Sequence, residues 1–118
     1  MGMRKFESGA TRDDDVRKLH VTRFFSPEVL KRRAEYMDKH RVMRDGSLRE
    51  PDNWKAGMPQ SSYIESMDRH VLDVKLWANG SPELYQDDIE EKLCAVMFNA
   101  EGLLYEILKQ REELEEEE

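Results

Sequence analysis

Three stretches of the chain carry apolar residues at helical spacing, and they predict helices over residues 27–42, 60–78 and 87–111. In the second stretch the apolar residues step by three or four: Ile64, Met67, Val71, Val74 and Ala78. In the third they form a face wide enough to contact two neighbouring helices: Ile89, Leu93, Val96, Met97, Ala100, Leu103, Leu104, Ile107 and Leu108. This pattern predicts an all-α protein, a small helical bundle.

Helix-boundary residues agree with these spans. Ser26-Pro27-Glu28 is typical of a helix start, because serine caps free amides and proline is tolerated at the first helical position. Asn79-Gly80-Ser81-Pro82 ends the second helix, and the short connection that follows predicts an antiparallel hairpin with the third. Between the first two helices, residues 44–54 are rich in turn-forming residues and end at Trp54, which indicates an ordered loop.

The two ends of the chain lack this periodicity. Residues 1–25 are expected to form an irregular arm, within which 20–25 are short enough for one extended segment. Residues 112–118 hold six of the 26 acidic residues, and we expect a frayed, solvated helix end there. The other 20 acids nearly balance the 19 lysines and arginines, which argues against general nucleic-acid binding, although 31–33 and 41–44 are locally basic.

Length and composition set further bounds. A chain of 118 residues predicts one domain, 1–118, close to the size at which helical proteins complete their core by forming a homo-oligomer. The sequence contains no long apolar run and no secretory signal pattern, so we expect no membrane association and a cytoplasmic location. Its single cysteine, Cys94, lies in an apolar stretch and is expected to be a buried small residue.

Polar residues at helical spacing form the candidate site. On the third helix Asp88, Glu91 and Asn99 share one side, and on the second His70 and Asp73 are one turn apart. If the hairpin brings these rows together, their oxygen and nitrogen atoms suit a divalent cation inside a bundle. Simpler roles stay open: acids at a helix start interact favourably with its dipole, and His70 and Asn99 can be structural.

Several segments, in the same order, resemble the phage-encoded dATP/dGTP diphosphohydrolase N-terminal-domain family. They are RKFESGATRD at 4–13, FSPEVL at 25–30, AEYMDKHRV at 34–42, DNWKAGMP at 52–59, SMDRHVLDV at 66–74 and EEKLCAVMFNAEGLLYEIL at 90–108. That family is associated with MazG-like pyrophosphohydrolases, which are all-α, typically oligomerise, and use Mg²⁺ or Mn²⁺ to cleave a nucleoside triphosphate into monophosphate and pyrophosphate. The resemblance implies hydrolysis of purine deoxynucleoside triphosphates in the host cytoplasm.

The helical spacing and the resemblance together imply roles for individual residues. The implied metal ligands are Glu90, Glu91, Asp73 and Asp87, and the implied catalytic residues are His70, Glu91 and Asp73. The implied substrate-binding residues are Arg12, Trp54, Lys55, Arg69 and Asn99. The MazG-type pair of EExxE followed by ExxD is absent in that form. An alternative is therefore a phage protein that binds a nucleotide without turnover and counters host nucleotide signalling, and a third is a helical partner-binding module.

Overall fold

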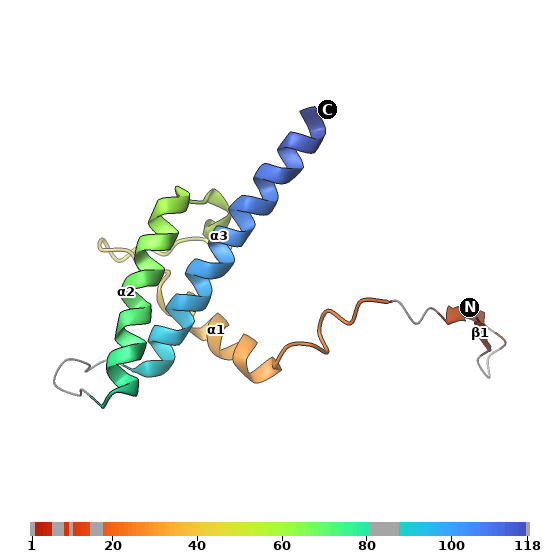
Figure 1. Cartoon of the computed structure of the whole chain (residues 1–118), viewed down its shortest axis with the longest axis horizontal. Helices are drawn as coiled ribbons and strands as arrows, with labels where there is room; N and C mark the ends of the chain where they lie inside the picture. Colours follow the sequence, from red (N-terminus) through yellow and green to blue (C-terminus); the bar gives the residue numbers. More distant parts are fainter. Residues whose placement is uncertain (1, 6–8, 10, 15–17, 81–87, 118) are drawn as a thin grey trace. The chain divides into compact units, whose positions relative to one another are not determined.

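A computed structural model describes residues 2–5, 9, 11–14, 18–80 and 88–117. The chain divides into two units, Met1–Leu30 and Lys31–Glu118, and each is described by itself. The elements in chain order are β1 (Gly2–Lys5), β2 (Thr11–Asp14), α1 (Pro27–Lys39), the 3₁₀ helix η1 (Asn53–Ala56), α2 (Gln60–Ala78) and α3 (Ile89–Glu117). The predicted all-α class is confirmed, with three helices close to the predicted spans (Figure 1).

The first unit differs from the irregular arm that the sequence predicts. β1 and β2 pair antiparallel, with Gly2 opposite Asp14 and Lys5 opposite Thr11. The extended segment expected over 20–25 is wrong, because residues 21–24 form turns and the amide of Phe25 donates to the carbonyl of Thr22 (3.3 Å). Short-range backbone hydrogen bonds therefore set the conformation of this segment, and its apolar pattern is too short to predict that conformation.

The start of α1 follows the predicted capping chemistry. The Ser26 hydroxyl oxygen accepts a hydrogen bond from the amide of Val29 (3.2 Å) and donates to the Glu28 carboxylate (3.0 Å). This helix ends at Lys39, three residues before the predicted end, because the chain then folds back and Val42 pairs with Leu48 in an antiparallel bridge. Because α1 ends early, residues that were predicted to be helical belong to the following loop, and some of them line a cavity described below.

α2 and α3 pack against each other as the predicted antiparallel hairpin (Figure 1). The buried residues of these two helices are Tyr63, Cys94, Ala95 and Asn99, each 2–3% exposed. The Tyr63 ring lies against Gly102, where any side chain would overlap it. A glycine at this point therefore allows the two helices to approach closely.

The predicted core stripes are only partly correct. On α2 the buried residue is Tyr63, whereas the neighbouring Ile64 is half exposed. On α3 the predicted core residues Leu93, Leu104 and Ile107 are exposed to solvent. The apolar face of α3 is broader than one neighbouring helix covers, so much of its outer side remains open.

The last helix also continues further than predicted. It extends to Glu117 rather than ending near residue 111, and its side chains over 112–117 are exposed. Among the helices that the structure describes, none combines the length and the apolar composition needed to cross a lipid bilayer.

Candidate functional site

The loop after α1 is held in place by two arginines. Arg41 donates from Nε to the carbonyl of Arg49 (2.7 Å) and from Nη1 to Asp38 (3.2 Å), while Arg49 donates from Nη1 to the carbonyl of His40 (3.2 Å). The tip of the loop is a tight turn in which Asp45 accepts from the amide and hydroxyl of Ser47. Asp45 has a lowered pKa because these Ser47 groups donate to it. The loop is thus ordered by its own polar groups, not by a hydrophobic core.

Trp54 is placed by η1, which follows this loop. Its ring meets the ring of Tyr105 on α3 edge to face, with the centroids 5.1 Å apart and the planes at 80°. Gly57 ends η1 with φ +75°, and the Glu106 carboxylate occupies the space that a side chain at this glycine would need. The tryptophan is still 41% exposed, so one part of its surface is free to contact another molecule.

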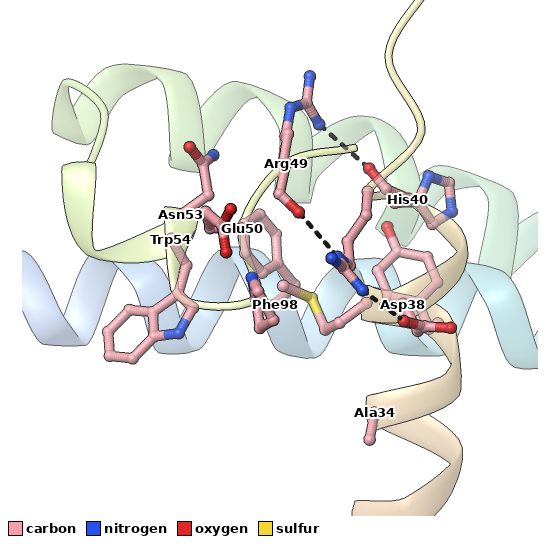
Figure 2. A pocket seen from close by; sticks show the side chains of 12 residues that line it. Ala34, Asp38, His40, Arg49, Glu50, Asn53, Trp54 and Phe98 are labelled. Carbon is pink, nitrogen blue, oxygen red and sulfur yellow. Dashed lines mark hydrogen bonds and ion pairs between the residues drawn. The ribbon is translucent and has the colours of Figure 1, made fainter. Parts of the chain in front are cut away.

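A cavity of about 550 Å³ lies between α1, this loop, η1 and α3 (Figure 2). It is lined by Ala34, Tyr36, Met37, Asp38, His40, Arg41, Arg49, Glu50, Pro51, Asn53, Trp54 and Phe98. Figure 2 shows Arg49 of the loop, Trp54 of η1 and Phe98 of α3 around the same space. Its walls combine aromatic surfaces, two guanidinium groups, two carboxylates and one amide.

A second cavity of about 280 Å³ lies beside the first and shares Tyr36 and His40 with it. Half of its lining residues are charged: Tyr36, Lys39, His40, His70, Asp88, Glu91, Lys92 and Ala95. The predicted catalytic residues His70 and Glu91 are therefore brought together at one cavity. The third, Asp73, is close behind them, 3.1 Å from Lys92 Nζ and 3.9 Å from His70 Nδ1.

Basic side chains, however, form ion pairs with the predicted metal ligands. Arg32 bonds Glu90 through Nε (2.7 Å) and Glu91 through Nη2 (3.4 Å), and Lys39 bonds Glu91 (3.2 Å). Asp87 lies outside the described residues. Over the described ranges no group of three or more His, Cys, Asp or Glu side chains is placed to hold a metal ion. Among the described ligands the arrangement does not fit a Mg²⁺ or Mn²⁺ site, since Glu90, Glu91 and Asp73 each already have a cationic partner.

The same contacts control protonation of Glu91. Burial acts to raise its pKa, but hydrogen bonds from Lys39, His40 and Arg32, together with the Lys39 charge, outweigh burial, so the pKa is lowered. Glu91 is therefore an ionised carboxylate at neutral pH. Its hydrogen bonds stabilise the negative charge, so proton uptake by this group is disfavoured.

His70 has the opposite charge preference. Burial and the Lys92 charge lower its pKa below 6.5, and nearby Asp73 only partly opposes them. Its Nδ1 atom is buried and has no hydrogen-bond partner among the described residues. His70 is accordingly a neutral imidazole at neutral pH, and this residue lines the smaller cavity.

The predicted substrate-binding residues have different outcomes. Trp54 lines the larger cavity, while Lys55 lies beside it with Nζ 5.8 Å from the tryptophan ring centre and 3.7 Å from Asp52. Arg69 is exposed on α2 and lines neither cavity. The side chain of Arg12, in β2 of the first unit, lies outside the described part of the structure.

Asn99 has a structural role. Its Nδ2 donates to the carbonyl of Ala95 one turn earlier in α3 (2.8 Å), and the residue is 3% exposed. It lines neither cavity. The buried amide is therefore paired within its own helix, which corresponds to the structural alternative that the sequence left open.

Sequence reasoning missed most of the larger cavity. The locally basic segments 31–33 and 41–44 were noted, but Arg32 and Arg33 pair with acids of α3 rather than pointing to a ligand. Arg49, Asn53 and Phe98 gave no helical pattern that pointed to a common site.

Comparisons with models of known protein families, with curated proteins and with solved structures find no match. The resemblance to diphosphohydrolases therefore stays a prediction.

Proposed function

We propose that this protein is a cytoplasmic nucleotide-binding protein that holds a purine nucleotide in the larger cavity without turning it over. One observation carries the proposal: aromatic surfaces and two guanidinium groups line the same space of about 550 Å³. Ligand cavities for molecules of this size usually measure about 300–1,000 Å³ and combine apolar walls with a few polar groups.

Each part of a nucleotide has a chemical counterpart in this lining. Trp54, Tyr36 and Phe98 offer ring surfaces on which a base can stack. Arg41 and Arg49 have five N–H donors each, and only part of that capacity is used by their contacts with described residues. The remaining donors suit phosphate oxygens.

Two polar side chains of the cavity suit the edge of a purine. The Asn53 amide is both a donor and an acceptor, which matches the amino group and ring nitrogen of adenine. The Glu50 carboxylate is a pure acceptor, which matches an exocyclic amino group or the N–H edge of guanine. These pairings suit adenine or guanine, and cytosine, which also has an amino group beside a ring nitrogen, is the pyrimidine to compare with them.

Hydrolysis of purine deoxynucleoside triphosphates is the second candidate. It is favoured by the meeting of His70 and Glu91 at the smaller cavity, which adjoins the larger one through Tyr36 and His40. Binding without turnover is placed first because Arg32 and Lys39 occupy the carboxylates that would have to hold the metal ion.

One experiment separates these candidates. The purified protein is incubated with a panel of purine and pyrimidine nucleotides, with Mg²⁺, with Mn²⁺ and with EDTA, and chromatography is run on the solution and on what the denatured protein releases. We expect an intact purine nucleotide from the protein in all three conditions. Monophosphate and pyrophosphate formed only with metal would instead support hydrolysis, and no retained or consumed nucleotide would reject both.

A further inference from the structure

α3 carries an apolar stripe on the side that faces away from α2. Its members alternate steps of four and three residues over three seven-residue repeats: Leu93, Met97, Ala100, Leu104, Ile107, Arg111 and Leu114. Six of the seven are apolar or small, and all but the half-buried Met97 are exposed. We call this set the outer stripe.

The outer stripe is separate from the face that packs within the chain. At 3.6 residues per turn it lies opposite Gly102 and Glu106, which face the Tyr63 ring and Gly57 at the end of η1. Leu104 is 54% exposed and Ile107 is 45% exposed. α3 therefore presents one apolar side to its own chain and a second to the exterior.

A seven-residue repeat of this kind fits another helix that has the same repeat. Such stripes pair by inserting side chains of one helix between those of the other, over about 30 Å for a stretch of this length. Among the described helices, only α3 offers an exposed stripe that continues over more than two turns. A second copy of α3 supplies the matching partner, in a two-fold interface that uses one surface twice.

The small core gives an independent reason for a second copy. Within the described residues no large side chain is fully buried, and only Tyr63, Cys94, Ala95 and Asn99 are 2–3% exposed. A single core of this size provides little of the apolar burial that stabilises a folded domain. Covering two outer stripes against each other adds the missing burial.

The charges determine the direction of pairing. Residues 112–117 contain five glutamates beside the C-terminal end of the stripe. A parallel pair would place ten of these carboxylates together, twice the five of one copy. An antiparallel pair instead separates the two acidic ends, one at each end of the interface.

We infer that the protein forms an antiparallel homodimer through the outer stripe of α3, crossing near Leu104 and Ile107. The long Arg111 side chain then faces the small Ala100 of the other copy, so the one charged position of the stripe has room and its guanidinium reaches the solvent. This inference is independent of nucleotide binding, because none of the stripe residues lines the larger cavity.

Sedimentation equilibrium tests it on the full chain. We expect a mass of twice 14.0 kDa for the unmodified protein and of 14.0 kDa for Leu104→Glu/Ile107→Glu. Leu72→Glu is the matched control, because Leu72 on α2 is as exposed as Leu104 but lies outside the stripe, and it should remain a dimer. A monomeric unmodified protein, or a dimer that survives the double substitution, overturns the inference.

If Leu104→Glu/Ile107→Glu loses its helical circular dichroism signal, a milder variant tests the inference. Leu104→Ala/Ile107→Ala keeps helix-forming residues, and we expect its dimer dissociation constant to rise at least about 100-fold. An unchanged dissociation constant in a helical protein overturns the inference. Replacing the glutamates of 112–117 by glutamine tests direction: a dissociation constant that falls at least tenfold overturns antiparallel pairing, and a smaller change supports it.

Discussion

Nε of Arg32 on α1 lies 2.7 Å from Oε1 of Glu90 at the start of α3. The same guanidinium bonds Glu91 and lies 3.6 Å from Asp88, so one cation holds three carboxylates. The hydrogen bond to Glu90 is the main reason why the pKa of Arg32 is raised further above its ordinary value. Acids that the sequence suggested as metal ligands instead connect two helices.

This contact predicts that divalent cations leave the stability of the protein unchanged. A cation at 100 times its dissociation constant would add about 2.7 kcal/mol to the free energy of unfolding, which is several degrees in Tm. We expect no such rise when Mg²⁺ or Mn²⁺ replaces EDTA in a thermal melt. Arg32→Gln is the comparison, since it lowers Tm but frees the carboxylates and should make Tm respond to Mn²⁺.

The neutral state of His70 predicts a loss of stability on acidification. Its pKa is lower in the folded protein than in the unfolded chain, so below pH 6.5 the unfolded chain takes up the proton first. The free energy of unfolding should therefore fall from pH 6.5 down to the lowered folded pKa. His70→Gln should flatten this part of the curve in urea titrations. An unchanged slope in His70→Gln contradicts the assignment.

The buried amide of Asn99 predicts a stability effect without a binding effect. Asn99→Ala removes the bond from Nδ2 to the Ala95 carbonyl and should lower the free energy of unfolding by about 1 kcal/mol. Nucleotide affinity should be unchanged in calorimetry, because Asn99 lines neither cavity. A tenfold loss of affinity in a fully folded variant would instead show that Asn99 contributes to nucleotide binding.

The contact of Tyr63 with Gly102 predicts a steric penalty. Gly102→Ala should lower the free energy of unfolding by about 1–3 kcal/mol, although alanine favours a helix by about 1 kcal/mol over glycine. In a Tyr63→Leu background the same substitution should cost less, since the ring is gone. Equal costs in the two backgrounds, measured by urea unfolding, would show that the ring does not set the helix spacing.

The helices could be predicted from the sequence because their apolar period and their capping residues are local signals. The Ser26 cap and the end at Ala78 are examples. The direction in which each face points is not local. Ile64 and Tyr63 are adjacent and both apolar, and only the close approach at Gly102 decides that Tyr63 is the buried one.

The candidate site was less predictable for a related reason. His70, Asp73 and Glu91 do lie near one another, as their helical spacing and the hairpin suggested. Their partners Arg32 and Lys39 come from α1, about 50–60 positions earlier in the chain, and no periodic pattern joins α1 to them. The larger cavity depends on the path of a loop, which follows from individual hydrogen bonds such as Arg41 to Arg49.

Isothermal titration calorimetry of dATP and dGTP in the presence of EDTA tests the central claim most directly. The unmodified protein should bind at least one of them, and Trp54→Ala should weaken binding by roughly 5- to 150-fold, the range expected for loss of one base-stacking contact. Trp77→Ala is the matched control, because Trp77 is similarly exposed on α2 and lines neither cavity, and it should bind as the unmodified protein does. Equal affinities of all three proteins, or no heat of binding without metal, would contradict nucleotide capture in this cavity.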